Sequence, residues 1–362
     1  MKQKGLVLAL AVVAAGGVQA QERSGDSELT LAEVDALTHR LDTLPEIYGQ
    51  LGLVMEHRDT ENVPGSETAF RDSNSWIGLR GTTELMPGTE GFFRAEWASI
   101  PSADDDDERM FDEHMEYAYI GLEGDFGRLW GGVDDTIYEQ KLDQVANFFE
   151  GEYRDEDGDS ERHLFGPYTT GRTRLVQYTS PSWGDVRLHG AVQLKEDGSP
   201  EVQSGDEKED RPYQAVLSYT PGHWEWALGM DSNDGGDVVP AGASQAEQLR
   251  QENENTYGAR MTYQGEGWLL TAQYQHRKDV ASVASLLSSY HIGPNRFSIA
   301  WERERNELAP GTTATETTNA YTAQVLHDLT ESMAIYVEGY KTYSDEQTPH
   351  QYDLMVGAQY RF

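Results

Sequence analysis

The last residues of the sequence are Tyr352-Asp353-Leu354-Met355-Val356-Gly357-Ala358-Gln359-Tyr360-Arg361-Phe362, and two kinds of side chain alternate along them. Every second side chain in it is apolar or aromatic, from Tyr352 to Phe362, and the positions between them are mostly polar or small. Successive side chains of a β-strand point to opposite faces, so this stretch predicts a strand with one continuous apolar face.

The same alternation recurs along the chain from Pro45 onward. Antiparallel strands of even number can close into a barrel that has no exposed edge. We count sixteen such segments: 46–57, 74–83, 90–99, 115–123, 127–134, 172–180, 184–195, 212–220, 223–231, 255–264, 267–276, 285–292, 295–304, 319–327, 332–343 and 351–362.

The connections between the segments tend to alternate between short turns and long acidic stretches, such as 101–113, 196–211, 232–254 and 304–318. Short turns at one end and long loops at the other are typical of a transmembrane barrel. Helical periodicity is confined to 31–44 and 136–149. The sequence therefore predicts an all-β, 16-stranded antiparallel transmembrane β-barrel over 45–362. A soluble β-sandwich or solenoid is the alternative, but it leaves the aromatic residues at the strand ends of the apolar face unexplained.

The N-terminal part differs from the rest. Lys2 and Lys4, an apolar run at 5–15 and the small residues before position 21 predict a signal peptide over 1–20. Residues 21–44 predict a short helical extension, because Thr30 and Glu33 fit a capping box and leucines follow at helical spacing. This helix lies against the body of the protein in one interpretation and forms a coiled-coil seam between subunits in the other.

Composition excludes several classes of protein. The 362 residues contain 63 acidic and 28 basic side chains, a net charge of −35, so we expect no nucleic-acid partner. Removal of residues 1–20 takes away two lysines and no acid, which leaves −37. Cysteine is absent, which excludes disulfides, thiolate metal sites and cysteine nucleophiles. His163 with Ser160 nearby is the one suggestive catalytic neighbourhood, and nothing orients it, so we expect no enzyme.

Three stretches carry a resemblance to a known family: 75–85 (SWIGLRGTTEL), 116–127 (EYAYIGLEGDFG) and 356–362 (VGAQYRF). Over 46–362 the chain resembles the general (non-specific) porins of Gram-negative outer membranes. The resemblance implies a homotrimer in the cell outer membrane and a terminal Phe362 that acts as the assembly signal. It also implies that a third loop, at about 134–170 here, folds into the lumen and narrows the pore. This loop contains eleven acidic and three basic residues.

In the family, loop carboxylates face a ladder of basic residues on the wall. Glu116 and Trp76 stand where the family commonly has a basic residue, so the ladder is thinned to Arg58, Arg80, Arg94 and some of Arg172, Arg174, Arg187 and Arg260. We expect the pore constriction to contain Arg80, Arg94, Glu96, Glu116, Glu150, Glu152 and Asp155.

The functional expectation is a water-filled channel for passive diffusion of small hydrophilic solutes and ions. The acidic loop predicts a preference for cations, since a narrow pore focuses the potential of its charges. The alternative is a channel specific for a sugar or another organic solute, with Trp76, Tyr336 and Tyr340 facing inward.

No cofactor is expected. Asp155, Asp157 and Asp159 form a weak candidate site for Ca²⁺, although a solvated acidic loop explains them better. Outer-membrane lipid is an expected partner, and acidic loops could bridge lipopolysaccharide through divalent cations.

Overall fold

The computed structural model describes residues 44–61, 64–98, 115–151, 173–194, 212–232, 255–277, 281–306, 316–344 and 350–362. The chain divides into two compact units, Met1–Leu44 and Pro45–Phe362. The predicted signal peptide and almost all of the predicted helical extension lie outside the described residues. Among the described residues, no helix is long and apolar enough to span a bilayer.

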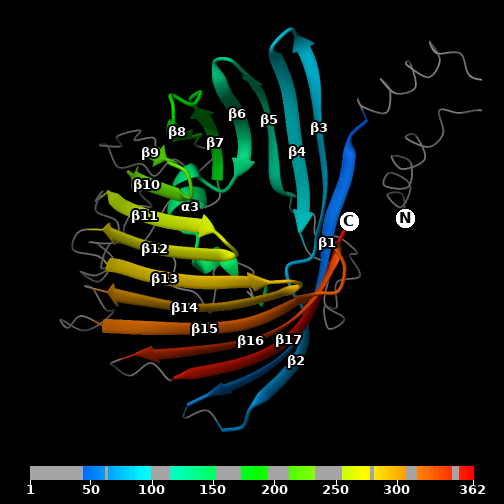
Figure 1. The fold of residues 1–362 in the computed structure, drawn as a ribbon, viewed down its shortest axis with the longest axis vertical. Coiled ribbons are helices and arrows are strands. Elements are labelled where there is room, and N and C mark those ends of the chain that lie inside the picture. Colours follow the sequence, from blue (N-terminus) through cyan, green and yellow to red (C-terminus); the bar gives the residue numbers. More distant parts are fainter. Residues whose placement is uncertain are drawn as a thin grey trace, which may run out of the picture. The chain divides into compact units, whose positions relative to one another are not determined.

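The second unit is a single antiparallel sheet in which strands consecutive along the chain are paired, with one exception near the start of the chain (Figure 1). The first and last strands also pair, over Gln50–Arg361 through Thr60–Gln351, so the sheet closes on itself. The strands are β1 Glu46–Thr60, β2 Glu67–Asp72, β3 Trp76–Met86, β4 Thr89–Ala98, β5 Met115–Gly124, β6 Gly127–Asp134, β7 Thr173–Thr179, β8 Val186–Gln193, β9 Tyr213–Tyr219, β10 Trp224–Asp231, β11 Thr256–Gly265, β12 Trp268–Arg277, β13 Ala281–Ile292, β14 Asn295–Asn306, β15 Glu316–Asp328, β16 Met333–Ser344 and β17 Gln351–Arg361.

Strands β2 and β3 are two parts of one barrel strand. Both pair with β1, which binds β3 along its first residues and β2 further on. The break falls at residues 73–75, where Asn74 has a positive φ of 58°. Ser75 Oγ donates to Gly52 O at 3.2 Å and accepts from Gly52 N at 2.9 Å, so the break is held against β1. The barrel therefore has sixteen strands, as predicted from the alternation.

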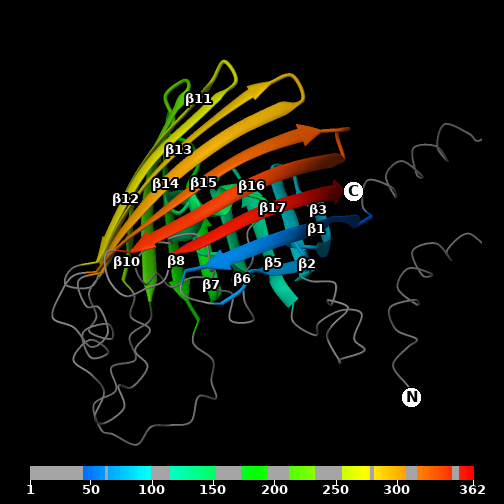
Figure 2. The same ribbon diagram turned by 90° about the horizontal axis from the view of Figure 1, so that it is seen from below.

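Burial alternates along the strands, and the exposed row is apolar. In β17, Leu354 and Val356 are exposed whereas Asp353 and Met355 are buried. The same pattern holds in β9 and β10, where tryptophan, leucine and tyrosine are exposed. An outward apolar row with polar side chains inside is the distribution required of a barrel in lipid. The tilted strands that carry this surface are seen in Figure 2.

The predicted segment boundaries are close to the observed strands, and β6 at 127–134 is identical. The largest differences are β2, which the prediction omitted, and β13, which begins at Ala281 instead of 285. The omission of β2 has a physical cause. The even-numbered residues of β1 lie on the inner face of the barrel. In β2 their partners on that face are odd-numbered (Glu67, Ala69 and Arg71), whereas in β3 their partners are even-numbered. The break changes the phase of the alternation, which hides the continuity of the strand.

Candidate functional site

The segment after β6 contains the helix α3 (Ile137–Leu142) and the 3-10 helix η1 (Ala146–Phe148). Thr136 caps α3, since its side chain accepts a hydrogen bond from Glu139 N at 3.4 Å. Tyr138 and Leu142 are fully buried on one face of the helix. In Figure 1, α3 lies beside β9, β10 and β11 on the inner side of the wall.

Two glycines of the wall make room for α3. A Cβ built on Gly229 would lie 2.8 Å from Leu142, and one on Gly258 would lie 2.4 Å from the Tyr138 hydroxyl. Both glycines belong to the inward row, because they pair with each other across β10 and β11. The helix therefore packs at a place where two neighbouring strands of the wall have no side chain on the inner face.

Charged groups then fix the end of α3. Arg260, fully buried on β11, donates to the carbonyl of Lys141 and to Glu225 Oε1, the second at 2.7 Å. Lys141 Nζ lies 3.3 Å from the same carboxylate. One carboxylate thus contacts two bases, one on the wall and one on α3.

Just beyond α3, Asp143 Oδ1 accepts hydrogen bonds from two wall amides, Gln273 at 3.3 Å and Gln275 at 2.7 Å. Gln273 Oε1 in turn accepts from the backbone N–H of Gln144 at 3.1 Å. The segment is therefore bound to β12 through reciprocal polar contacts. The Asp143 carboxylate is stabilised there by neutral amide donors, although it lies at the C-terminal end of α3, where the helix dipole does not favour an acid.

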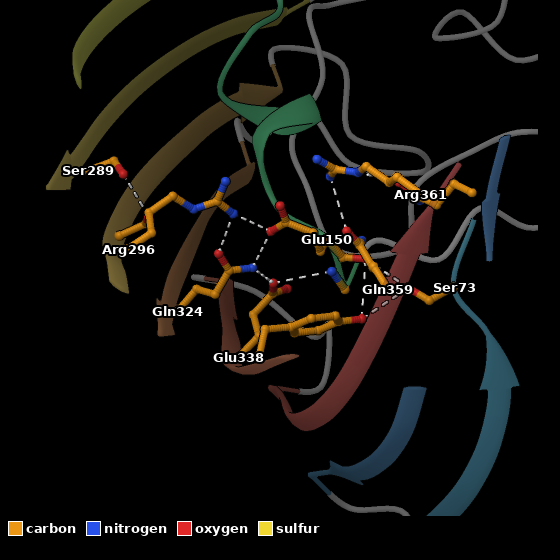
Figure 3. Close-up of polar contacts among 12 residues, drawn as sticks. Ser73, Glu150, Ser289, Arg296, Gln324, Glu338, Gln359 and Arg361 are labelled. Carbon is orange, nitrogen blue, oxygen red and sulfur yellow. Dashed lines mark hydrogen bonds and ion pairs between the residues drawn. The ribbon is translucent and has the colours of Figure 1, made fainter. Parts of the chain in front are cut away.

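The segment reaches β14, β15 and β16 at residues 150 and 151 (Figure 3). Glu150 forms an ion pair with Arg296, and its Oε2 accepts from Gln324 Nε2 at 2.7 Å. Gln324 Nε2 also donates to Glu338 Oε2 at 2.7 Å, and Gly151 N donates to the same oxygen at 3.2 Å. Two carboxylates and one guanidinium are thereby joined through a shared amide.

The backbone of Glu150 is bound as well. Its carbonyl accepts from Ser73 Oγ at 2.8 Å and from the Tyr336 hydroxyl at 3.4 Å. Ser73 belongs to the break between β2 and β3, so the break presents a hydroxyl to the segment. Residues 135–151 are consequently bonded to strands on both sides of the barrel seam between β17 and β1.

A second group of charges lies on β1, β3 and β4. Glu96 is buried, and its Oε1 accepts from Arg94 Nε at 2.7 Å and from the Tyr48 hydroxyl at 2.5 Å. Arg80 lies opposite Arg94 in the register and forms a bidentate ion pair with Glu46 at 2.8 Å. Each guanidinium therefore has its own carboxylate, and each lies over a tyrosine ring.

A third group lies where β17 meets β1. Glu56 is buried between Arg58, at 3.2 Å, and Arg71, at 3.4 Å. Arg58 Nε also lies 3.5 Å from Asp353 Oδ1. Acids and bases alternate here across β2, β1 and β17.

The structure brings Arg80, Arg94 and Glu96 together on one part of the inner wall. It places Glu150 on residues 135–151, the segment after β6 that lies against the inner wall and is called the inward segment. Glu116 lies next to this group along β5. The pairing skips from Glu96–Tyr117 to Trp97–Met115, which makes Glu116 the extra residue of a β-bulge, and Tyr117 takes the place beside Glu96. Glu152 and Asp155 lie outside the described residues, as do Asp157 and Asp159 of the weak calcium site.

Sequence reasoning missed Arg296, Gln324 and Glu338. Each lies in the inward row of its strand, which the alternation identifies once the outward row is known. Their meeting with Glu150 depends on how the segment after β6 crosses the barrel, and no local pattern encodes that path.

A closed sixteen-stranded barrel with an apolar outer face and a charged interior defines the class of outer-membrane channel proteins. The sequence matches the family model described as Gram-negative porin over residues 7–347, so the chain belongs to that family and is an outer-membrane protein. No curated protein matches the sequence.

Solved structures share the fold at low sequence identity. OmpF of Salmonella typhi, in a complex with daunomycin, has 15% identity and a TM-score of 0.67, with 89% of this chain and 98% of that chain covered. The anion-selective porin of Comamonas acidovorans has 14% identity and a TM-score of 0.66, with 88% and 100% covered. A loop-deletion mutant of Vibrio cholerae OmpT has 13% identity and a TM-score of 0.61, with 89% and 100% covered.

Proposed function

We propose that the protein forms a water-filled, cation-preferring channel for passive diffusion of small hydrophilic solutes and ions, and that it is not an enzyme. The observation that carries this proposal is the segment 135–151, which lies on the inner wall of a closed barrel and has four acidic residues and one base. The net charge of −35 supports the same sign of selectivity. Under this proposal, the segment together with Arg80, Arg94 and Glu96 forms the constriction.

Selectivity of this origin depends on salt. Fixed charges raise the local concentration of counter-ions in a narrow pore, and dissolved ions screen them. The Debye length falls from about 30 Å at 0.01 M to about 3 Å at 1 M ionic strength. Reversal potentials of the purified protein in planar bilayers, measured in potassium chloride gradients at both ends of this range, test the proposal. We expect a cation preference that is strongest in dilute salt, and equal permeabilities or an anion preference would reject it.

The channel is proposed to be a homotrimer. One of the similar solved structures, OmpT of Vibrio cholerae, is described in a trimer form. The terminal Phe362 and the apolar outer rows are consistent with assembly in the membrane. Mass measurement of the detergent-extracted protein, before and after heating, distinguishes a trimer from a monomer.

A channel specific for one organic solute is the second candidate. Tyr48 and Trp76 contact each other edge to face, with ring centroids 5.0 Å apart, on the inner wall near Arg80. Such rings could hold the apolar face of a sugar. Swelling rates of proteoliposomes in sugars of equal size distinguish the candidates, because a diffusion channel passes them at equal rates and a specific channel does not.

A further inference from the structure

The backbone carbonyl of Glu150 is bound by two hydroxyls that come from opposite sides of the seam between β17 and β1 (Figure 3). Ser73 Oγ donates to this carbonyl at 2.8 Å, and the Tyr336 hydroxyl donates to it at 3.4 Å. The two hydroxyl oxygens lie 3.1 Å from each other. Ser73 is bonded to β1 through its N–H, whereas Tyr336 belongs to β16, which pairs with β17. We call these two hydroxyls and the carbonyl the seam clasp.

Each of the two strands at the seam has a glycine where a residue of the clasp approaches it. A Cβ built on Gly357 of β17 would collide with the Tyr336 ring, so the ring crosses β17 on the inner face because that position has no side chain. A Cβ built on Gly52 of β1 would collide with the carbonyl oxygen of Ser73. The break between β2 and β3 approaches β1 closely for the same reason. The sequence thus leaves room on both seam strands for residues of the next strands to reach the clasp.

The tip of the inward segment, residues 150–151, is also bonded to the wall at this place. Gly151 N donates to Glu338 Oε2 on β16 at 3.2 Å, and a Cβ built on Gly151 would lie 2.7 Å from the other oxygen of that carboxylate. Ser73, Tyr336 and Glu338 are at most 2% exposed. A buried polar group that loses its hydrogen bond is costly, so each partner of the tip depends on the others.

Other side chains cross the seam in a simpler way. Arg361 Nε donates to Gln50 Oε1 at 3.1 Å, and Arg58 Nε lies 3.5 Å from Asp353 Oδ1. Both contacts join β17 to β1 directly. The seam clasp differs from them because a third element, the inward segment, lies between its two sides.

We propose that the tip of the inward segment is an internal brace of the barrel seam, with Ser73 and Tyr336 as its positioning residues. The Glu150 carbonyl accepts from both sides, so it joins β16 to the break between β2 and β3 across the two seam strands. In turn, the paired seam strands bring both hydroxyls within reach of one carbonyl. Closure of the barrel and placement of the inward segment in the channel therefore stabilise each other.

The test compares Ser73→Ala, Tyr336→Phe and the double variant with the wild type. Each single change removes one hydroxyl, and Tyr336→Phe keeps the ring. Release of the tip should make the single-channel current fluctuate between levels, with about fivefold more frequent transitions for each hydroxyl removed. The temperature at which the folded barrel is lost in detergent should fall by roughly 2–4 °C for each hydroxyl.

Ser289→Ala is the matched control for the current. Ser289 is fully buried in the inward row of β13, and its hydroxyl accepts from Ser298 Oγ of the neighbouring strand at 2.9 Å. The change therefore removes a buried hydroxyl that is bonded to the wall and not to the carbonyl of Glu150. We expect a similar loss of heat stability and the wild-type current.

A cross-link distinguishes a brace across the seam from a local contact. Leu53 of β1 and Ala358 of β17 lie opposite each other in the seam register and in the outward rows, away from the clasp. Opposite residues of antiparallel strands lie about 4.5–5.5 Å apart at Cα, which a disulfide spans, and the chain has no cysteine of its own. When both proteins carry the oxidised L53C/A358C pair, the double variant should be as heat-stable as the protein with an intact clasp. Its current fluctuations should remain, because the tip is still released.

An unchanged current in the double variant would overturn the proposal, as would an equal rise of fluctuations in Ser289→Ala. A loss of heat stability of the same size with and without the disulfide would also overturn it, because the clasp would then act locally. The single variants carry the same comparisons if the double variant does not assemble. These readouts do not depend on the sign of ion selectivity, which reversal potentials measure, so the brace and the cation preference can fail separately.

Discussion

The carboxylate of Glu150 is ion-paired with the guanidinium of Arg296, 146 residues further along the chain. The two side chains are mostly buried, with 8% and 15% of their surface exposed. The positive charge of Arg296 compensates the negative charge of Glu150. The Glu150 charge therefore affects ion selectivity only when its partner is removed. Selectivity should therefore respond to the removal of either member.

Replacing Arg296 by glutamine should strengthen cation preference, because it leaves the negative charge of Glu150 uncompensated. Glu150→Gln should weaken the preference by the opposite imbalance. We expect each change to alter the ratio of potassium to chloride permeability by about two- to fivefold, equivalent to roughly 0.4–1 kcal/mol. Reversal potentials in dilute potassium chloride measure the ratio.

The double variant R296Q/E150Q is the control for this pair, since it removes both charges and should restore a ratio near that of the wild type. A double variant that keeps the full shift of either single variant would show that the two charges act independently. In that case the ion pair would not be the origin of the effect.

The Arg94–Glu96 pair allows a second comparison at the inner wall. Glu96→Gln leaves the Arg94 guanidinium without its carboxylate, so cation preference should fall, and Arg94→Gln should raise it. Loss of the partner of buried Glu96 should also lower the free energy of unfolding by about 1–3 kcal/mol. Selectivity is measured in bilayers and stability by heating in detergent. Shifts of the same sign in both variants would contradict this prediction.

Gly258→Val should displace α3 from the wall. Its added Cβ would lie 2.4 Å from the Tyr138 hydroxyl and 3.1 Å from Leu142, both fully buried. Overpacking of this kind costs about 1–3 kcal/mol, and the helix can relieve it by moving toward the pore axis. Single-channel conductance should therefore fall.

Gly190→Val is the matched control, because the nearest atom to its built Cβ is Gln214 O at 3.7 Å, an ordinary contact. Its conductance should equal that of the wild type. A fall of similar size in both variants would show that valine in a strand, and not the displacement of α3, is responsible.

Deletion of Phe362 should impair barrel assembly while export from the cytoplasm continues. The residue extends the seam between β1 and β17 by two backbone hydrogen bonds, from Gly49 N to its carbonyl at 3.0 Å and from its N–H to Gly49 O at 3.1 Å. The fraction of heat-modifiable protein in outer-membrane preparations reports assembly. Phe362→Ala retains the backbone bonds and removes the ring, so assembly by this variant but not by the deletion assigns the role to the backbone.

Strand positions were predictable because a barrel imposes a local requirement on every strand: one face meets lipid and the other meets polar side chains. The tail 352–362 and the strand 127–134 keep the same outward row along their whole length, although Met355 and Trp130 are apolar residues of the inward row. The prediction was wrong where the alternation changes phase. At residues 73–75 the inward row changes from odd-numbered residues in β2 to even-numbered residues in β3. Because of this change, the predicted strand 74–83 did not include β2.

The site was less predictable for related reasons. Arg80, Arg94 and Glu96 were found because they lie in one uninterrupted inward row of neighbouring strands. Glu116 was expected in the same group, and the alternation did not show that it is the extra residue of a β-bulge and that Tyr117 is the residue paired with Glu96. Arg296 was not proposed as a site residue, because it belongs to the site through its ion pair with Glu150. The two residues are distant in sequence, and the path of the inward segment brings them together.

The bonds between Gly49 and Phe362 have a consequence for the covalent order of the chain. Because the first strand is hydrogen-bonded to the last, the two ends of the unit Pro45–Phe362 are neighbours, and its backbone runs in a nearly complete ring. The folded sheet does not require the chain termini to lie between β17 and β1, because every strand has two neighbours wherever the chain begins. A circular permutant that joins 362 to 45 and opens at a tight turn, such as Gly293-Pro294, retains every strand pair of the native barrel.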